Sequence, residues 1–187
     1  NTFAALQQWC REQKARGGSL KLSLGINLSG SSVMEEDLYD YIYEEMKRFK
    51  VDPDNIYFEV TETAAIRQLN KAQHFIKSMQ NLGFKFALDD FGSGMASFSY
   101  LRSLPVDYLK IDGQFVVGMV ENKIDQAMVK SMQEISSVMG MESIAEFVES
   151  EQIVKVLQNM EVTYAQGYYY DQPKPLNEVL KLGSVSN

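Results

Sequence analysis

The fold of this chain is constrained most strongly by six short apolar runs. A helix-like segment follows nearly every one of them. The runs are LSLGIN, IYFEVTE, FKFALDD, DYLKID, ESIAE and TYAQ. Strands that alternate with helices through right-handed crossovers form a parallel sheet. A closed (β/α)8 barrel needs eight strands, whereas the sequence shows six. We therefore expect an α/β fold that is either an open sheet or a barrel with about the first two strands absent from this chain.

The elements can be placed from apolar spacing and from the glycines that follow them. Strands are expected at residues 21–28, 56–62, 84–90, 106–112, 142–148 and 162–168. Helices are expected at residues 1–14, 32–50, 66–81, 96–103, 124–139, 150–160 and 176–182. The chain has 187 residues and no linker-like segment, so a single domain over residues 1–187 is predicted.

Each apolar run ends in, or close to, a side chain that can bind a metal ion or a phosphate. These side chains are Asn27, Glu59, Asp89 with Asp90, Lys110, Glu146 and Gln166. The carboxyl ends of parallel strands share one face of an α/β fold, so the six places should converge. An acidic cluster with one lysine is typical of a divalent-metal site that acts on phosphate.

Two of these positions also have simpler interpretations. Consecutive strand residues point to opposite faces, so Asp89 and Asp90 share a site only if the strand ends and twists there, which Gly92 allows. Otherwise the pair caps the next helix. Glu59 stands in an apolar run where an unpartnered carboxylate costs several kcal/mol. A metal ion or an ion pair with Lys110 would relieve this cost, and both can hold together.

Lys110 could orient or deprotonate a water molecule, or could serve only as a structural ion-pair partner. Asp112 follows two residues later and shares its face of the strand. Glu146 and Glu149 are spaced by three residues, as are the two glutamates of IYFEVTE.

Composition excludes several classes of protein. The net charge of −7 argues against DNA or RNA as a partner, because there is no basic excess to neutralise phosphates. The single cysteine, Cys10, indicates a reducing compartment, so a cytoplasmic location is expected, with a parent protein that could be membrane-anchored. His74 is the only histidine and is expected to be solvated, which leaves no histidine-based site. The chain has neither a Walker loop nor a GxGxxG motif.

Several motifs in order resemble those of a known family. They are NLS at 27–29, FEVTET at 58–63, ALDDFGSG at 87–94, YLRSLPVDYLKID at 100–112, AEFVES at 145–150 and AQGYYYDQPKP at 165–175. Together they resemble the EAL domain, a family of bacterial phosphodiesterases that cleave cyclic di-GMP. The resemblance covers nearly the whole chain and implies a modified (β/α)8 TIM-type barrel with one antiparallel strand.

The resemblance also implies a role for each of these residues. Asn27, Glu59 and Asp89 would bind one Mg2+ or Mn2+ ion, and Asp89 would bridge to a second ion held with Asp90 and Glu146. Lys110 would contact the attacking water.

Further residues would support the site in such a domain. Glu62 would anchor the loop from Phe91 to Met95, which in the family couples metal binding to dimerisation, and Glu149 is assigned to loop anchoring as well. Gln166 and Asp112 would lie close to the substrate or support the site.

Two departures from the family pattern stand out. The Glu-Ala-Leu motif on the first barrel strand has no match in the chain, and neither does a neighbouring arginine that holds the substrate phosphate. Phe147 stands where many members have glycine, and we expect it to be tolerated because Glu146 and Glu149 are kept.

The expected function is hydrolysis of cyclic di-GMP to linear pGpG with two divalent ions, with this chain by itself weak or inactive. The alternative is an inactive receptor that binds cyclic di-GMP. An enolate-stabilising barrel enzyme would also need carboxylates at strand ends and a lysine, but the ordered motifs argue against it. A homodimer and a linked GGDEF or sensor domain are the expected partners.

Overall fold

The computed structural model describes residues 2–15, 23–35, 37–93 and 99–182. Within these ranges six strands form one sheet in the order β1-β2-β3-β4-β5-β6, with every neighbouring pair parallel. The strands are β1 (Leu24–Leu28), β2 (Ile56–Thr61), β3 (Lys85–Phe91), β4 (Tyr108–Ile111), β5 (Glu142–Ala145) and β6 (Tyr164–Ala165). Strands that neighbour one another in the same order as in the sequence are typical of a barrel. In a doubly wound sheet the strand order reverses at a switch point.

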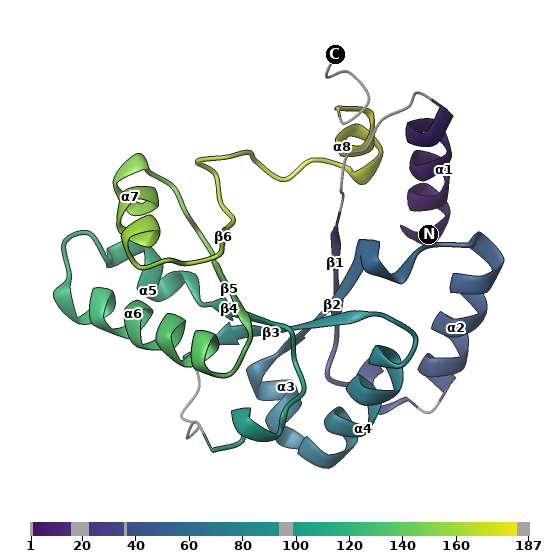
Figure 1. The fold of residues 1–187 in the computed structure, drawn as a ribbon, viewed down its shortest axis with the longest axis horizontal. Coiled ribbons are helices and arrows are strands. Elements are labelled where there is room, and N and C mark those ends of the chain that lie inside the picture. Colours follow the sequence, from purple (N-terminus) through teal and green to yellow (C-terminus); the bar gives the residue numbers. More distant parts are fainter. Residues whose placement is uncertain (1, 16–22, 36, 94–98, 183–187) are drawn as a thin grey trace.

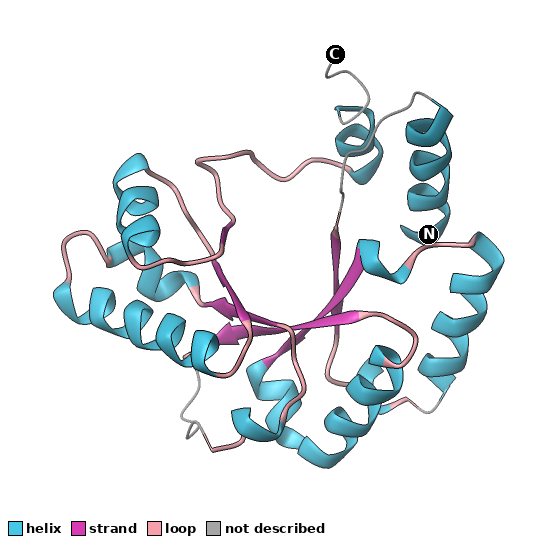
Figure 2. Ribbon diagram, viewed as in Figure 1, coloured by secondary structure: helices cyan, strands magenta, loops and turns pink. Residues whose placement is uncertain are grey.

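The sheet is curled, and helices lie around its outer side (Figures 1 and 2). The α-helices are α1 (Thr2–Ala15), α2 (Asp37–Phe49), α3 (Glu62–Arg67), α4 (Leu69–Gln80), α5 (Gly113–Gly118), α6 (Lys123–Val138), α7 (Glu151–Asn159) and α8 (Leu176–Leu182). The described residues also form the short 3-10 helices η1 (Ser32–Met34), η2 (Pro53–Asn55) and η3 (Leu101–Ser103). The predicted α/β barrel-type fold is confirmed as a half-barrel of six strands. Among the described residues, no helix has both the length and the apolar character to cross a membrane.

Packing of the apolar core determines which strand residues face the concave side of the curled sheet. Phe58, Phe86 and Leu109 belong to the large apolar cluster between sheet and helices, and the rings of Phe58 and Phe86 lie 5.6 Å apart. Tyr108 and Ala87 belong to a separate small cluster on the opposite face. Side chains alternate along a strand with a period of two, so the outward aromatic residues force their neighbours inward.

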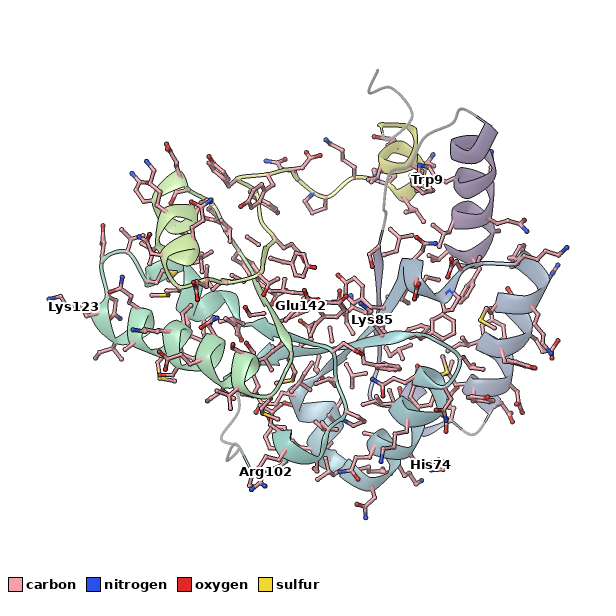
Figure 3. The ribbon with its side chains drawn as sticks, in the orientation of Figure 1. Trp9, His74, Lys85, Arg102, Lys123 and Glu142 are labelled. Atoms are coloured by element: carbon pink, nitrogen blue, oxygen red, sulfur yellow. The ribbon has the colours of Figure 1, made fainter. Side chains whose placement is uncertain are left out.

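Inward-facing side chains below the strand ends form a polar and aromatic layer. Lys85 Nζ donates to Tyr108 Oη at 3.2 Å, and Tyr164 Oη donates to Glu142 Oε1 at 3.2 Å. Figure 3 shows Lys85 and Glu142 near the middle of the molecule, while His74, Arg102 and Lys123 lie at its periphery. His74 is exposed, as expected.

Helix boundaries differ from the sequence prediction in three places. The helix expected at 66–81 begins already at Glu62, because Thr61 Oγ1 accepts a hydrogen bond from the amide of Ala64, and it is interrupted at Gln68. The helix expected at 32–50 is divided into η1 and α2. The structure also contains α5, which was not predicted because Gly113 and Gly118 lower helix propensity at both of its ends.

The remaining differences concern strand lengths and the segment after β3. Residues 21–22 of the first predicted strand lie outside the described residues, as do residues 96–98 of the helix predicted at 96–103, whose end forms η3. The strand predicted at 162–168 is reduced to Tyr164–Ala165. Beyond it, Gln166 and Tyr169 bond to the loop after β5, which ends the regular ladder.

Candidate metal centre

Four neighbouring strands deliver one buried ionic cluster. Lys110 Nζ on β4 lies 2.7 Å from Glu59 Oε2 on β2, 2.7 Å from Asp89 Oδ1 on β3 and 2.8 Å from Glu146 Oε1 just after β5. The four residues are between 3% and 9% exposed. All four lie on the inward face of their strands, at the carboxyl-terminal edge. The predicted convergence of these residues is therefore present in the structure.

The charges of this cluster do not balance. Three carboxylates surround one ammonium, and burial leaves little solvent to screen their mutual repulsion. Desolvation lowers the pKa of Lys110, but hydrogen bonds to Asp89, Glu146 and Glu59 outweigh it and raise the pKa above its ordinary value. Lys110 is therefore a fixed positive charge at neutral pH, and the cluster retains an excess of negative charge that further cations could neutralise.

A β-bulge lets Asp89 and Asp90 serve the same site. Leu88 pairs with Leu109 and Phe91 with Ile111, so β3 contains one residue more than β4 over this stretch. Asp90 takes up the extra residue with φ of +55°. The two carboxylates were expected to share a site only where the strand ends and twists. The twist is present as a bulge, but the strand does not end at Asp90, because β3 continues to Phe91.

The bulge produces a group of three carboxylates that could hold a cation. Ligand oxygens of Asp89, Asp90 and Glu146 all lie within 4.8 Å of one another. Asp89 Oδ1 is buried and faces the Lys110 ammonium at 2.7 Å, and no other donor among the described residues reaches it. Carboxylate oxygens are the preferred ligands of hard divalent cations such as Mg2+. The donor set therefore fits a divalent metal.

Two of these carboxylates, Asp90 and Glu146, bind a proton more tightly than usual. Desolvation, followed by repulsion from Asp89, raises the pKa of Asp90. Burial also raises the pKa of Glu146 despite the opposing effect of Lys110. Both raised pKa values show that the surrounding groups do not stabilise the negative charge of these two carboxylates enough to offset burial. A bound cation would stabilise that charge and lower both pKa values.

Asn27 extends the cluster toward the edge of the sheet. It pairs in register with Glu59, so its side chain leaves β1 on the same face, and it is exposed. Tyr57 lies below Glu59 on β2. Desolvation, followed by the charge of Glu59, raises the pKa of Tyr57 to about 12. Tyr57 was not singled out from the sequence, because one tyrosine in an apolar run carries no specific signal.

Glu62 connects β2 to the backbone that follows the bulge. Its Oε2 accepts from the amide of Gly92 at 3.0 Å, and its Oε1 accepts from Tyr100 Oη at 2.6 Å. Glu62 is 2% exposed. The first of these bonds reaches the loop to which its anchoring role was assigned, although residues 94–95 of that loop lie outside the described residues. Tyr100 was given no role from the sequence, although it is the first residue of the motif YLRSLPVDYLKID.

A cavity of about 220 Å3 adjoins the cluster at Glu146 and lies beyond the carboxyl-terminal ends of β5 and β6. It is lined by Glu146, Phe147, Glu149, Gln166, Gly167, Tyr168 and Pro173. Glu149 and Gln166 are exposed and therefore accessible from this cavity. Phe147 has φ of +52°, a region that favours glycine, and yet Glu146 beside it still reaches Lys110.

Asp112 lies at the start of α5, where its Oδ1 accepts from the amide of Gln114 at 2.8 Å. It therefore caps this helix, and its charge also contributes to the raised pKa of Asp90.

Comparisons with known proteins agree on one family. The family model described as EAL domain matches residues 1–173. Cyclic di-GMP phosphodiesterase PdeB of Shewanella oneidensis is 47% identical over 153 residues, which are 82% of this chain and 18% of that protein. Cyclic di-GMP phosphodiesterase PdeF of Escherichia coli is 34% identical over 155 residues, which are 83% of this chain and 21% of that protein. The chain thus spans about a fifth of the length of these relatives.

Solved structures agree in fold. The EAL enzyme Bd1971 with bound cAMP and cyclic di-GMP superposes with a TM-score of 0.90 at 26% identity, covering 96% of this chain and 48% of that one. The PaMucR phosphodiesterase in complex with c-di-GMP gives a TM-score of 0.83 at 27% identity, covering 93% and 71%. The motifs, the half-barrel and the family match together show that this chain belongs to the EAL domain family.

Proposed function

We propose that this domain hydrolyses cyclic di-GMP to linear pGpG with the help of two divalent cations, Mg2+ or Mn2+. The observation that carries the proposal is the cluster of Glu59, Asp89 and Glu146 around Lys110, with Asp90 brought in by the bulge. The names of the relatives support the substrate, as do the neighbouring structures with bound cyclic di-GMP.

In the proposed reaction water adds to the phosphorus of one phosphodiester, and the bond from phosphorus to the 3′ oxygen breaks. That oxygen leaves with a proton, and the phosphate stays on the 5′ side, which gives pGpG. Two bound cations would lower the pKa of the water and stabilise charge on the attacking and leaving oxygens.

The chain's own residues would hold and orient the reactants. Asn27, Glu59 and Asp89 would hold one cation, and Asp89, Asp90 and Glu146 the other. Lys110 would contact the attacking water, because its ammonium lies at the centre of the carboxylates. Gln166 would meet the substrate in the cavity beside Glu146.

A second candidate function is binding of cyclic di-GMP without hydrolysis. It is favoured by the ion pairs of Lys110, which partly neutralise the carboxylates without any cation. Measurement of turnover distinguishes hydrolysis from binding alone.

The full-length protein that carries this domain is incubated with cyclic di-GMP and Mg2+ or Mn2+, and products are separated by chromatography. We expect pGpG to form and EDTA to stop its formation. Binding of cyclic di-GMP without any pGpG would reject hydrolysis in favour of the receptor.

We also propose that the domain forms a homodimer. Val117, Val120 and Ile124 in and between α5 and α6 are 52%, 45% and 73% exposed, so apolar surface gathers over these neighbouring helices. Burial of such a patch favours association. Analytical ultracentrifugation of the full-length protein should show a dimer that is weakened by Ile124→Glu, with the exposed residue Thr63 (Thr63→Glu) as control. A strictly monomeric wild type would contradict the proposal.

A further inference from the structure

The geometry points to Tyr100 as a positioning residue that holds the metal-binding bulge of β3 through Glu62. This inference rests on the proposed function, because it concerns the same candidate metal centre. It adds a residue that is not one of the proposed metal ligands.

Glu62 has both carboxylate oxygens engaged by different parts of the chain. Tyr100 Oη donates to Oε1 at 2.6 Å, and the amide of Gly92 donates to Oε2 at 3.0 Å. Tyr100 is 9% exposed and Glu62 2% exposed, so water does not replace either bond easily. Hydrogen bonds to an ionised acceptor are shorter and stronger than neutral ones.

The second bond acts directly on the bulge. Gly92 follows Asp90 by two residues and has φ of +96°. The carbonyl of Asp90 accepts from both the amide and the hydroxyl of Ser93, at 3.2 and 2.8 Å. The backbone that follows the bulge is therefore held by the short-range bonds of Ser93 to Asp90 and by the bond of Gly92 to Glu62.

Tyr100 determines the rotation of the Glu62 carboxylate. A carboxylate held by one donor can turn about its last side-chain bond, whereas two donors at opposite oxygens fix its plane. When the Tyr100 hydroxyl is removed, one buried oxygen of Glu62 lacks its donor, and the group moves toward another partner. The amide of Gly92 then follows or loses its bond, and the orientation of Asp89 and Asp90 changes with it.

The test measures metal affinity and not only activity. Mn2+ binding to the full-length protein is followed by electron paramagnetic resonance for wild type and for Tyr100→Phe, under conditions in which circular dichroism shows both to be folded. We expect Tyr100→Phe to bind Mn2+ about 10-fold more weakly, since partners behind metal ligands typically contribute 10-fold to 100-fold.

Tyr108→Phe is the matched control. Tyr108 is also 9% exposed, and its hydroxyl accepts from Lys85 rather than bonding to Glu62. Its Mn2+ affinity should equal that of the wild type. An equal loss in both variants would show general destabilisation and overturn the inference.

A double-mutant cycle identifies the route. If Tyr100 acts through Glu62, then Glu62→Gln weakens Mn2+ binding and the double variant is no weaker than Glu62→Gln alone. Additive losses would show that Tyr100 does not act through Glu62. Unchanged Mn2+ affinity in Glu62→Gln would overturn the inference. The Glu62→Gln measurement also tests the inference if Tyr100→Phe does not fold. Failure of the wild type itself to bind Mn2+ would instead overturn the proposed function.

Discussion

Replacement of Asp89 by asparagine is expected to lower metal-dependent hydrolysis of cyclic di-GMP by about a thousandfold, which corresponds to about 4 kcal/mol of transition-state stabilisation. Asp89 lies in the three-carboxylate group with Asp90 and Glu146, and its buried Oδ1 has the Lys110 ammonium as its partner at 2.7 Å. Asparagine keeps the shape but removes the negative charge that a bridging ligand needs. Steady-state rates at saturating Mn2+ measure the effect.

The control for this variant is Asp54→Asn. Asp54 is exposed in η2 before the amino-terminal end of β2, whereas the candidate site lies at the carboxyl-terminal edge of the sheet, so the same chemical change should leave the rate unaltered. Near-normal hydrolysis by Asp89→Asn would show that Asp89 does not bridge two ions. Activity that returns at higher Mn2+ concentration would instead indicate weakened binding.

Replacement of Lys110 by methionine should strongly destabilise the metal-free protein. The ammonium lies within 2.8 Å of oxygens from Glu59, Asp89 and Glu146. Its removal leaves three buried carboxylates without their common cation, and loss of one partner of a buried ion pair costs about 3–5 kcal/mol. Urea unfolding in the presence of EDTA should show this loss, and added Mn2+ should recover part of it by binding the native state.

The pH dependence of this loss has a defined sign. The pKa of Lys110 is raised in the folded state, so its stabilising effect is complete below its ordinary value of 10.5 and is lost only above it. At low pH the carboxylates of the variant become protonated, and the difference from the wild type should shrink.

Lys85→Met is the matched control, because Lys85 also faces inward but is exposed and bonds to the hydroxyl of Tyr108. Its stability should change by less than about 1 kcal/mol. A metal-free Lys110→Met protein as stable as the wild type would show that the carboxylates do not depend on the lysine.

The sequence was sufficient to predict a parallel α/β sheet and the position of the charged residues, and the motifs that resemble the EAL domain added the winding of a barrel. Strands that alternate with helices form a parallel sheet, and the period of two along IYFEVTE places Glu59 and Phe58 on opposite faces of it without any knowledge of neighbouring strands. Element boundaries were less predictable. Thr61 caps α3 earlier than expected, and α5 lies between two glycines that argue against a helix.

The sequence by itself therefore determined which strands carry carboxylates and that these strands end on one edge of the sheet. Only the tertiary structure decided that Asp89 and Asp90 point to the same place, because the extra residue of the bulge exists only relative to the register of β4. It also decided that Glu62 bonds to Tyr100, 38 residues away. Local patterns specify the direction of a side chain, whereas register and long-range hydrogen bonds depend on which segments pack together in the folded chain.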